Sequence, residues 1–185
     1  MMNRFAGDLF VGMQMRPASK AQVVHSFDVD DTLTMKPENF DNTGLTKDQF
    51  FDKAREFPAD EAVVDLAKLL HSKGDAIAIA TARPAERLLE TIDWLNKHGV
   101  PYNEIMLSNG KEVSSVAKQE MLQALQDKYR MVGTLFDDSA ANILGAKLQG
   151  VDAVHLLKNE EYWNAHPEKT YKLMRWTTNH LLLST

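Results

Sequence analysis

The chain has 185 residues, 44% of them hydrophobic and 25% charged, which is typical of one globular domain spanning residues 1–185 with a sizeable core. Because the chain has no cysteine, disulfides, thiolate metal sites and cysteine nucleophiles are excluded. The formal net charge of -5 argues against sequence-independent binding of nucleic acid, which depends on many Lys and Arg contacts with phosphates.

The sequence shows no signal for membrane insertion or secretion. No apolar run approaches the length of a membrane span, and residues 1–15 include Asp8 and lack the unbroken apolar core of a signal peptide. The absence of cysteine suits a reducing compartment. We therefore expect a cytoplasmic protein that does not contact membranes, and nothing in the composition indicates an obligate protein partner.

Short apolar runs alternate with amphipathic segments from about residue 22 onward. Val23–Phe27 is predicted to be a strand, and residues 60–72 a helix, because apolar residues recur there at helical spacing. Residues 76–80 form a continuous apolar run, which is typical of a strand covered on both faces. Pro84 is predicted to open a second helix, which ends near residue 99.

The second half of the chain continues this alternation. The elements predicted there are a strand at 104–107, a helix at 115–129, a strand at 131–136, a helix at 140–148 and a strand at 151–156. Single helices between strands imply right-handed crossovers and a parallel sheet between helical layers. The predicted fold class is therefore α/β, a three-layer sandwich with a central parallel sheet.

Two segments depart from this alternation. Residues 34–58 form the one long irregular stretch, and long loops in compact domains are commonly lids or binding loops. Four phenylalanines in it predict a flap or minimal cap that folds onto something apolar: Phe40, Phe50, Phe51 and Phe57. Residues 159–183 are predicted to form one or two helices that pack on the sheet, broken at Pro167. The candidate packing residues are Tyr171, Met174 and Trp176.

Polar side chains follow several of the predicted strands. Asp28, Asp30 and Asp31 stand within four residues directly after the first strand, where their like charges call for a cation or a shared proton. Ligands of an open parallel sheet bind beyond the carboxyl ends of its strands. Three further groups are expected at that edge: Thr81, Asp137 and Asp138. Lys118, in a predicted helix twenty residues before Asp138, belongs to the same pocket.

These residues resemble the four motifs of the haloacid dehalogenase-like (HAD) phosphohydrolase superfamily. The run Asp28-Val29-Asp30-Asp31-Thr32 is similar to the first motif, and Ile79-Ala80-Thr81-Ala82-Arg83 to the second. Lys118 corresponds to the third motif, and the run from Leu135 to Asn142 to the fourth. The resemblance covers residues 23–142. It implies a Rossmannoid sheet with strand order 3-2-1-4-5 and a nearly capless enzyme.

The resemblance also implies a reaction, the Mg²⁺-dependent hydrolysis of phosphomonoesters through an aspartyl phosphate. Asp28 would attack phosphorus, and Asp30 would protonate the leaving oxygen and later deprotonate the attacking water. Lys118 would hold phosphoryl oxygens and restrain Asp28. The carboxylate of Asp30 favours phosphatase or phosphomutase chemistry over ion transport, because the ion-pumping ATPases of the superfamily have threonine there.

Metal ligands and their supports are implied in the same way. Mg²⁺ would join the carboxylate of Asp28, the backbone carbonyl of Asp30 and the carboxylate of Asp138. Asp137 would orient Lys118 or a metal-bound water. Asn142 would support the outer shell of the metal, or lie in the first turn of the following helix.

Three neighbouring residues, Thr81, Ala82 and Arg83, are expected to bind the phosphate or the rest of the substrate. Asp31 stands where the family usually has glycine, and we interpret it as a turn residue. Lys111 competes for the third motif, but it lies in a loop, whereas Lys118 lies in an amphipathic helix. We therefore assign Lys118.

The small flap predicts an open site, which suits a phosphate carried on something large. The third and fourth motifs are partly similar to the phosphatase domain of phage polynucleotide kinase-phosphatase, which predicts a nucleic acid 3'-phosphate end as substrate. The chain departs from those relatives at two positions: it has Ser114 where they carry an aspartate, and Lys36 where they carry an arginine. A 5'(3')-nucleotidase is the nearest alternative, and an inactive binding module with the HAD fold is an alternative of another class. A phosphomutase is disfavoured, because mutases need a closing cap.

Overall fold

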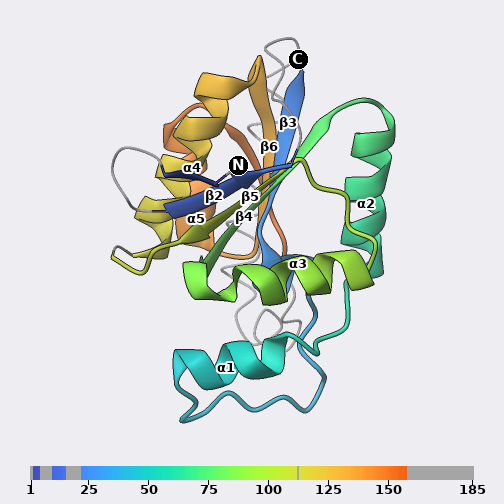
Figure 1. Ribbon diagram of the computed structural model, residues 1–185, viewed down its shortest axis with the longest axis vertical. Coiled ribbons are helices and arrows are strands. Elements are labelled where there is room, and N and C mark those ends of the chain that lie inside the picture. Colours follow the sequence, from blue (N-terminus) through green and yellow to red (C-terminus); the bar gives the residue numbers. More distant parts are fainter. Residues whose placement is uncertain (1, 5–9, 16–21, 112, 158–185) are drawn as a thin grey trace, which may run out of the picture.

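The computed structural model describes residues 2–4, 10–15, 22–111 and 113–157 (Figure 1). None of the helices in this part of the chain has the length and apolar character needed to cross a membrane. The predicted helices at 159–183 lie outside the described residues. The same is true of the residues predicted to break or pack that segment: Pro167, Tyr171, Met174 and Trp176.

One sheet forms the middle of the described structure. Its strands are β1 (Met2–Arg4), β2 (Phe10–Gln14), β3 (Val23–Phe27), β4 (Ala76–Pro84), β5 (Glu104–Ser108), β6 (Met131–Asp137) and β7 (Asp152–His155). They are arranged in the order β1-β2-β5-β4-β3-β6-β7. The five strands from β3 onward are parallel and confirm the predicted order 3-2-1-4-5.

Two strands that the sequence did not predict extend the sheet at one edge. There β2 pairs antiparallel with β5, from Phe10 opposite Ser108 to Gln14 opposite Glu104, and β1 pairs antiparallel with β2. The two strands are short and carry no marked alternation. They cover an edge of β5 whose backbone groups would otherwise lack strand partners.

Helices cover both faces of the sheet, so the predicted three-layer α/β fold is confirmed (Figure 1). These helices are α2 (Glu61–Ser72), α3 (Leu88–Lys97), α4 (Ser114–Lys128) and α5 (Ala140–Leu148). On one face α4 and α5 pack around Leu122 and Ile143. On the other face α2 and α3 pack around Val64 and Leu95.

The alternation of side chains in β4 lets one apolar strand serve both layers. Ala78 and Ala80 belong to the core beneath α4 and α5, whereas Ile77 and Ile79 belong to the core beneath α2 and α3. Successive side chains of a strand point to opposite faces of the sheet, which explains the division.

The far end of β4 differs from the prediction. The strand continues from Ala80 to Pro84, with an irregular pairing to β5 between Thr81 and Pro84. The prediction that Pro84 opens a helix is therefore wrong: it ends the strand, and a 3-10 turn at Ala85–Arg87 leads into α3. Pairing with β5 thus places Thr81 within the strand.

The flap at 34–58 contains a helix, α1 (Lys47–Ala54), where an irregular segment was expected. Thr46 and Gln49 form a capping box at its start, in which each side chain accepts a hydrogen bond from the other's backbone N–H. This pairing satisfies backbone donors that a helix start leaves free. Figure 1 shows α1 apart from the sheet, beyond α3.

Both ends of the flap are tied to the rest of the fold. Thr34 and Ala59 form an antiparallel bridge, and the backbone N–H of Met35 donates to the carbonyl of Pro58 at 2.8 Å. Buried Trp94 of α3 donates from Nε1 to the carbonyl of Phe57 at 2.9 Å. Edge-to-face contacts then join Phe57 to two further flap residues, Phe40 and Phe50.

We expect Leu122→Ala to lower the free energy of unfolding by about 2–5 kcal/mol, because Leu122 is fully buried on the inner face of α4. The matched control is Leu148→Ala in α5, which should change it by less than about 0.5 kcal/mol, because Leu148 is 78% exposed. Urea denaturation of the two variants measures both values. Equal losses would contradict this account of the core.

Candidate active site

The first two carboxylates of the site are presented by a tight turn after β3. In this turn, Val29–Leu33, Asp31 has a φ of 57°, a left-handed conformation that Asp adopts more readily than most residues. The N–H of Asp31 donates to Thr34 Oγ1 at 3.1 Å. The turn leaves Asp28 and Asp30 at the carboxyl edge of the sheet, two residues apart.

Lys118 is buried between two carboxylates. Its Nζ lies 2.8 Å from Asp28 Oδ1 and 3.1 Å from Asp137 Oδ2, and it also donates to the backbone carbonyl of Ala80. The three N–H donors of the ammonium thus have three acceptors. Because Lys118 is only 1% exposed, this cation is satisfied by protein groups.

Protein donors hold both carboxylate oxygens of Asp137, which is fully buried. Oδ1 accepts from the N–H of Ser139 at 2.9 Å and from Asn142 Nδ2 at 2.9 Å. Oδ2 accepts from Asn142 Nδ2 at 3.0 Å and faces Lys118. These contacts are those expected of a residue that orients Lys118.

Burial opposes charge on both members of the central pair. It works to lower the pKa of Lys118, but the carboxylates of Asp137 and Asp28 outweigh it and raise that pKa, so the ammonium stays charged. Burial raises the pKa of Asp28 well above its ordinary value; Lys118 counteracts this in part, while the other nearby carboxylates add to it. A further positive charge beside Asp28 would favour its ionised form at neutral pH.

Arg83 is turned toward Asp30. Its Nε donates to Asp30 Oδ2 at 2.9 Å and its Nη2 to Asp30 Oδ1 at 2.7 Å, a bidentate ion pair. Its Nη1 donates to Thr91 Oγ1 of α3 at 3.3 Å. The Arg83 side chain is 2% exposed, so the pair fixes the orientation of Asp30. The sequence pattern indicated a substrate contact for Arg83 and gave no signal for this pairing.

Asp138 completes a group of three carboxylates. Single oxygens of Asp28, Asp137 and Asp138 all lie within 4.8 Å of one another. Burial, followed by the charges of Asp137 and Asp31, raises the pKa of Asp138 to about 7. His155 Nε2 contacts the backbone carbonyl of Asp138 at 2.6 Å, which ties the end of β6 to β7. Carboxylates this close favour a bound cation or a proton.

These groups surround a cavity of about 260 Å³ at the carboxyl edge of the sheet. The predicted site residues that line it are Asp28, Asp30, Thr81, Ala82, Arg83, Asp138 and Asn142. Lys118 and Asp137 are buried next to it and reach Asp28 and Asn142 by the contacts given above. The structure therefore brings every predicted site residue to one place.

Five lining residues were not assigned to the site from the sequence: Asp31, Phe50, Phe51, Ser114 and Ser139. The aromatic content of the flap pointed toward the two phenylalanines, which α1 carries to the cavity. Asp31 forms an ion pair with Lys36, whose Nζ lies 5.6 Å from the centre of the Phe50 ring. Ser114 begins α4, and only the packing of that helix brings it to the site.

Sequence comparison identifies the family. A profile of the HAD superfamily, subfamily IIIB (acid phosphatase), matches residues 6–173, so the chain belongs to this family. No curated protein sequence matches the chain significantly.

Comparison with solved structures supports the fold. A chain of the Pnkp1/Rnl/Hen1 complex matches with a TM-score of 0.60 and 17% identity, over 78% of this chain and 48% of that one. The class C acid phosphatase from Bacillus anthracis matches with a TM-score of 0.58 and 19% identity, over 76% of this chain and 68% of that one. The chain spans about half the length of the matched chains in two Pnkp1/Rnl/Hen1 structures, 48% and 45%. Because the sequence identities are below 20%, these structural matches show a shared fold and nothing further.

We expect Asp138→Asn to stabilise the protein at pH 8 in the presence of EDTA. With a folded pKa of about 7 against an ordinary value of 3.8, Asp138 lowers stability as pH rises from about 4 to 7, and asparagine removes that loss. For this partly exposed group the gain is about 1–2 kcal/mol, or on the order of 5 °C in Tm. Thermal unfolding at pH 5 and pH 8 measures it. The same Tm difference between variant and wild type at both pH values would contradict the prediction.

Proposed function

We propose that the chain is a Mg²⁺-dependent phosphomonoesterase that forms an aspartyl phosphate on Asp28. The observation that carries this proposal is the Lys118 ammonium, held 2.8 Å from Asp28 Oδ1 at the cavity that Asp30 and Thr81 also line. A carboxylate nucleophile needs such a neighbour, because burial alone favours its protonated, unreactive form.

The residues present fit a divalent cation. Hard oxygen ligands are what Mg²⁺ prefers, and the carboxylates of Asp28 and Asp138, with the backbone carbonyl of Asp30, would supply them. Asp137 is less suited as a ligand, because protein donors engage both its oxygens. Buried Asn142 Oδ1 also has no hydrogen-bond donor among the described residues, although Asn142 lines the cavity. Bound there, the cation would polarise a phosphoryl oxygen and offset the carboxylate charges.

The proposed reaction has two displacements at phosphorus. In the first, an oxygen of Asp28 bonds to phosphorus while the bond to the leaving oxygen breaks, and Asp30 gives that oxygen a proton. In the second, water bonds to phosphorus, its proton passes to Asp30, and the bond between phosphorus and Asp28 breaks. Arg83 holds the Asp30 carboxylate in one orientation, and one of its two hydrogen bonds to Asp30 would have to break before that oxygen carries the proton.

Phosphate binding falls to groups at the end of β4, whereas Lys118, whose three N–H donors already have protein acceptors, would contribute its charge. Thr81 Oγ1 accepts a hydrogen bond from the N–H of Arg83 at 3.2 Å, which leaves its hydroxyl proton for a phosphoryl oxygen. Ala82 lines the cavity beside Thr81 and offers backbone groups only. The charge of Lys118 would stabilise the negative charge that develops in the transition state.

For the substrate, we propose a nucleic acid 3'-phosphate end, with free mononucleotides as the alternative. The flap is small, since α1 is its only helix in the described residues, and a small flap suits a phosphate at the end of a longer chain. Phe50 and Phe51 offer apolar surface beside the carboxylates. Because a terminal nucleotide and a free nucleotide would both meet that surface, an assay has to distinguish them.

We expect Asp28→Asn to reduce hydrolysis of a generic phosphomonoester by at least about 10³-fold, because an amide oxygen is a far weaker nucleophile than a carboxylate. Phosphate release with Mg²⁺ measures it, and circular dichroism checks folding. Wild type with EDTA should be similarly inactive. The matched control, Asp65→Asn, alters an exposed carboxylate of α2 and should keep full activity. A wild type without turnover would favour the inactive binding module.

We expect phosphate release from 3'-phosphorylated oligonucleotides to exceed release from mononucleotides by about tenfold or more in kcat/KM, because flanking nucleotides add contacts outside the cavity. Steady-state assays with both substrates at equal Mg²⁺ measure the ratio. Equal values would remove support for a nucleic acid end and favour the nucleotidase.

A further inference from the structure

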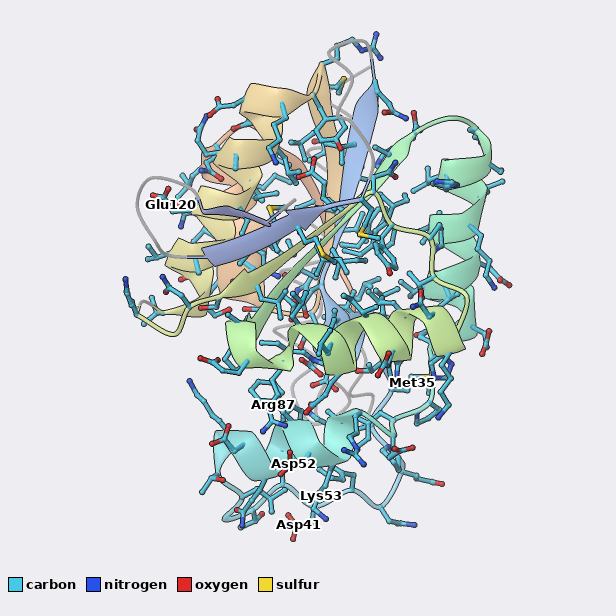
Figure 2. The ribbon with its side chains drawn as sticks, viewed as in Figure 1. Met35, Asp41, Asp52, Lys53, Arg87 and Glu120 are labelled. Atoms are coloured by element: carbon cyan, nitrogen blue, oxygen red, sulfur yellow. The ribbon has the colours of Figure 1, made fainter. Side chains whose placement is uncertain are left out.

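Arg87 joins the flap helix to the helix layer beside the active site. It ends the 3-10 turn that follows β4, and its Nη1 donates to Asp52 of α1 at 2.6 Å and to Glu90 of α3 at 3.1 Å. Its Nη2 contacts Asp48 of α1, both at the side chain and at the backbone carbonyl, at 3.4 Å. Figure 2 shows Arg87 in the space between α3 and α1.

This cluster differs from an ordinary surface ion pair in the number of carboxylates that meet one arginine. The Arg87 side chain is 14% exposed, whereas Asp48 and Asp52 are 81% and 62% exposed. The arginine is therefore partly buried, and the two aspartates reach toward it from one helix. Asp48 and Asp52 are four residues apart, so they share a face of α1. Because Arg87 contacts both side chains, it limits how that helix can rotate. Isolated exposed pairs contribute little, but a multidentate arginine with several carboxylates is stronger.

The helix that Arg87 holds carries part of the cavity wall. Phe50 and Phe51 lie between the two aspartates in sequence, and both line the cavity that contains Asp28 and Asp30. Any rotation or lifting of α1 would move these rings relative to the carboxylates. The orientation of α1 therefore sets the shape of the cavity on the side away from the sheet.

The segment that holds α1 also holds the proposed acid and base. Thr91 Oγ1 donates to the backbone carbonyl of Arg87 at 2.8 Å and accepts from Arg83 Nη1 at 3.3 Å. Arg83 in turn forms the bidentate pair with Asp30. One short segment, from Arg83 to Thr91, thus positions the Asp30 carboxyl group through one arginine and the flap helix through the other.

We propose that Arg87 is a positioning residue that holds α1 as a lid, with Phe50 and Phe51 against the leaving group of the phosphomonoester. This inference rests on the proposed function and adds the structural basis for selecting the leaving group. Two aromatic rings favour a planar, apolar leaving group over a small polar one, because they bury apolar surface. Arg87 contributes to that selectivity without touching the reacting atoms.

The test compares Arg87→Gln with Lys53→Gln. Lys53 is the matched control, because it is an exposed basic residue of α1, the helix that Arg87 contacts, and it lies away from Arg87 in Figure 2. For Arg87→Gln we expect KM for p-nitrophenyl phosphate to rise about five- to tenfold. The values of kcat for both esters, and KM for glycerol 2-phosphate, should stay within about twofold of those of the wild type. Arg87→Lys should raise KM for p-nitrophenyl phosphate less than Arg87→Gln does, since lysine keeps the positive charge but lacks the several N–H donors of the guanidinium. Lys53→Gln should match the wild type.

Two measurements do not depend on turnover. Calorimetric titration should show that Arg87→Gln weakens binding of phenylphosphonate about five- to tenfold and leaves binding of methylphosphonate unchanged. Chymotrypsin should cleave the flap of Arg87→Gln faster than that of wild type, at the phenylalanines of α1. Asp52→Asn should also weaken binding of phenylphosphonate and speed cleavage. The double variant should show less than the sum of the two effects, because both substitutions remove the same contact between Arg87 and Asp52.

The outcomes separate this inference from the proposed function. A wild type that hydrolyses neither ester contradicts the proposed function, and the phosphonate titrations then decide the role of Arg87. Faster cleavage with an unchanged ratio of the two phosphonate affinities means that Arg87 serves stability alone, which overturns the proposal. Unchanged cleavage and an unchanged ratio overturn it as well.

Discussion

The active site depends on one buried cation, the ammonium of Lys118. Without it, the carboxylates of Asp28 and Asp137 would face each other away from water, where like charges are costly. The ammonium satisfies both, and it also reaches the carbonyl of Ala80 in the middle of the sheet. Helix α4 therefore has to pack close to β4, and the small side chains of Ala78 and Ala80 on that face leave room for this approach.

The end of β4 is the second organising element. The strand delivers Thr81 to the cavity, and Arg83 follows and orients Asp30. The turn after Pro84 then places Arg87 against the flap helix. One continuous segment thereby contacts both the turn after β3 and the flap, each of which lies far from it in the sequence. Because Arg83 is 2% exposed, packing sets its geometry, whereas Arg87 is held by its several carboxylate partners.

Several parts of the fold follow directly from local patterns. Alternating apolar runs predicted the five parallel strands and four of the helices, since burial on one or two faces leaves a readable period. The capping box at Thr46 could have predicted α1 from the same sequence, but a short helix with few buried residues has a weak pattern. Strand β2 and the extension of β4 to Pro84 arise from pairing with β5, and β1 arises from pairing with β2; such pairing has no local signature.

The sequence by itself determined which polar residues follow which strand, because covalent spacing ties Asp28, Thr81 and Asp138 to the ends of apolar runs. The family resemblance already implied that Lys118 restrains Asp28, and the structure has that ion pair. Only the tertiary structure showed that Asp30 pairs with Arg83 and that α1 contacts Arg87. The physical reason is distance: each ion pair joins elements far apart in the chain, so its geometry depends on how the helices and the sheet pack around a common core.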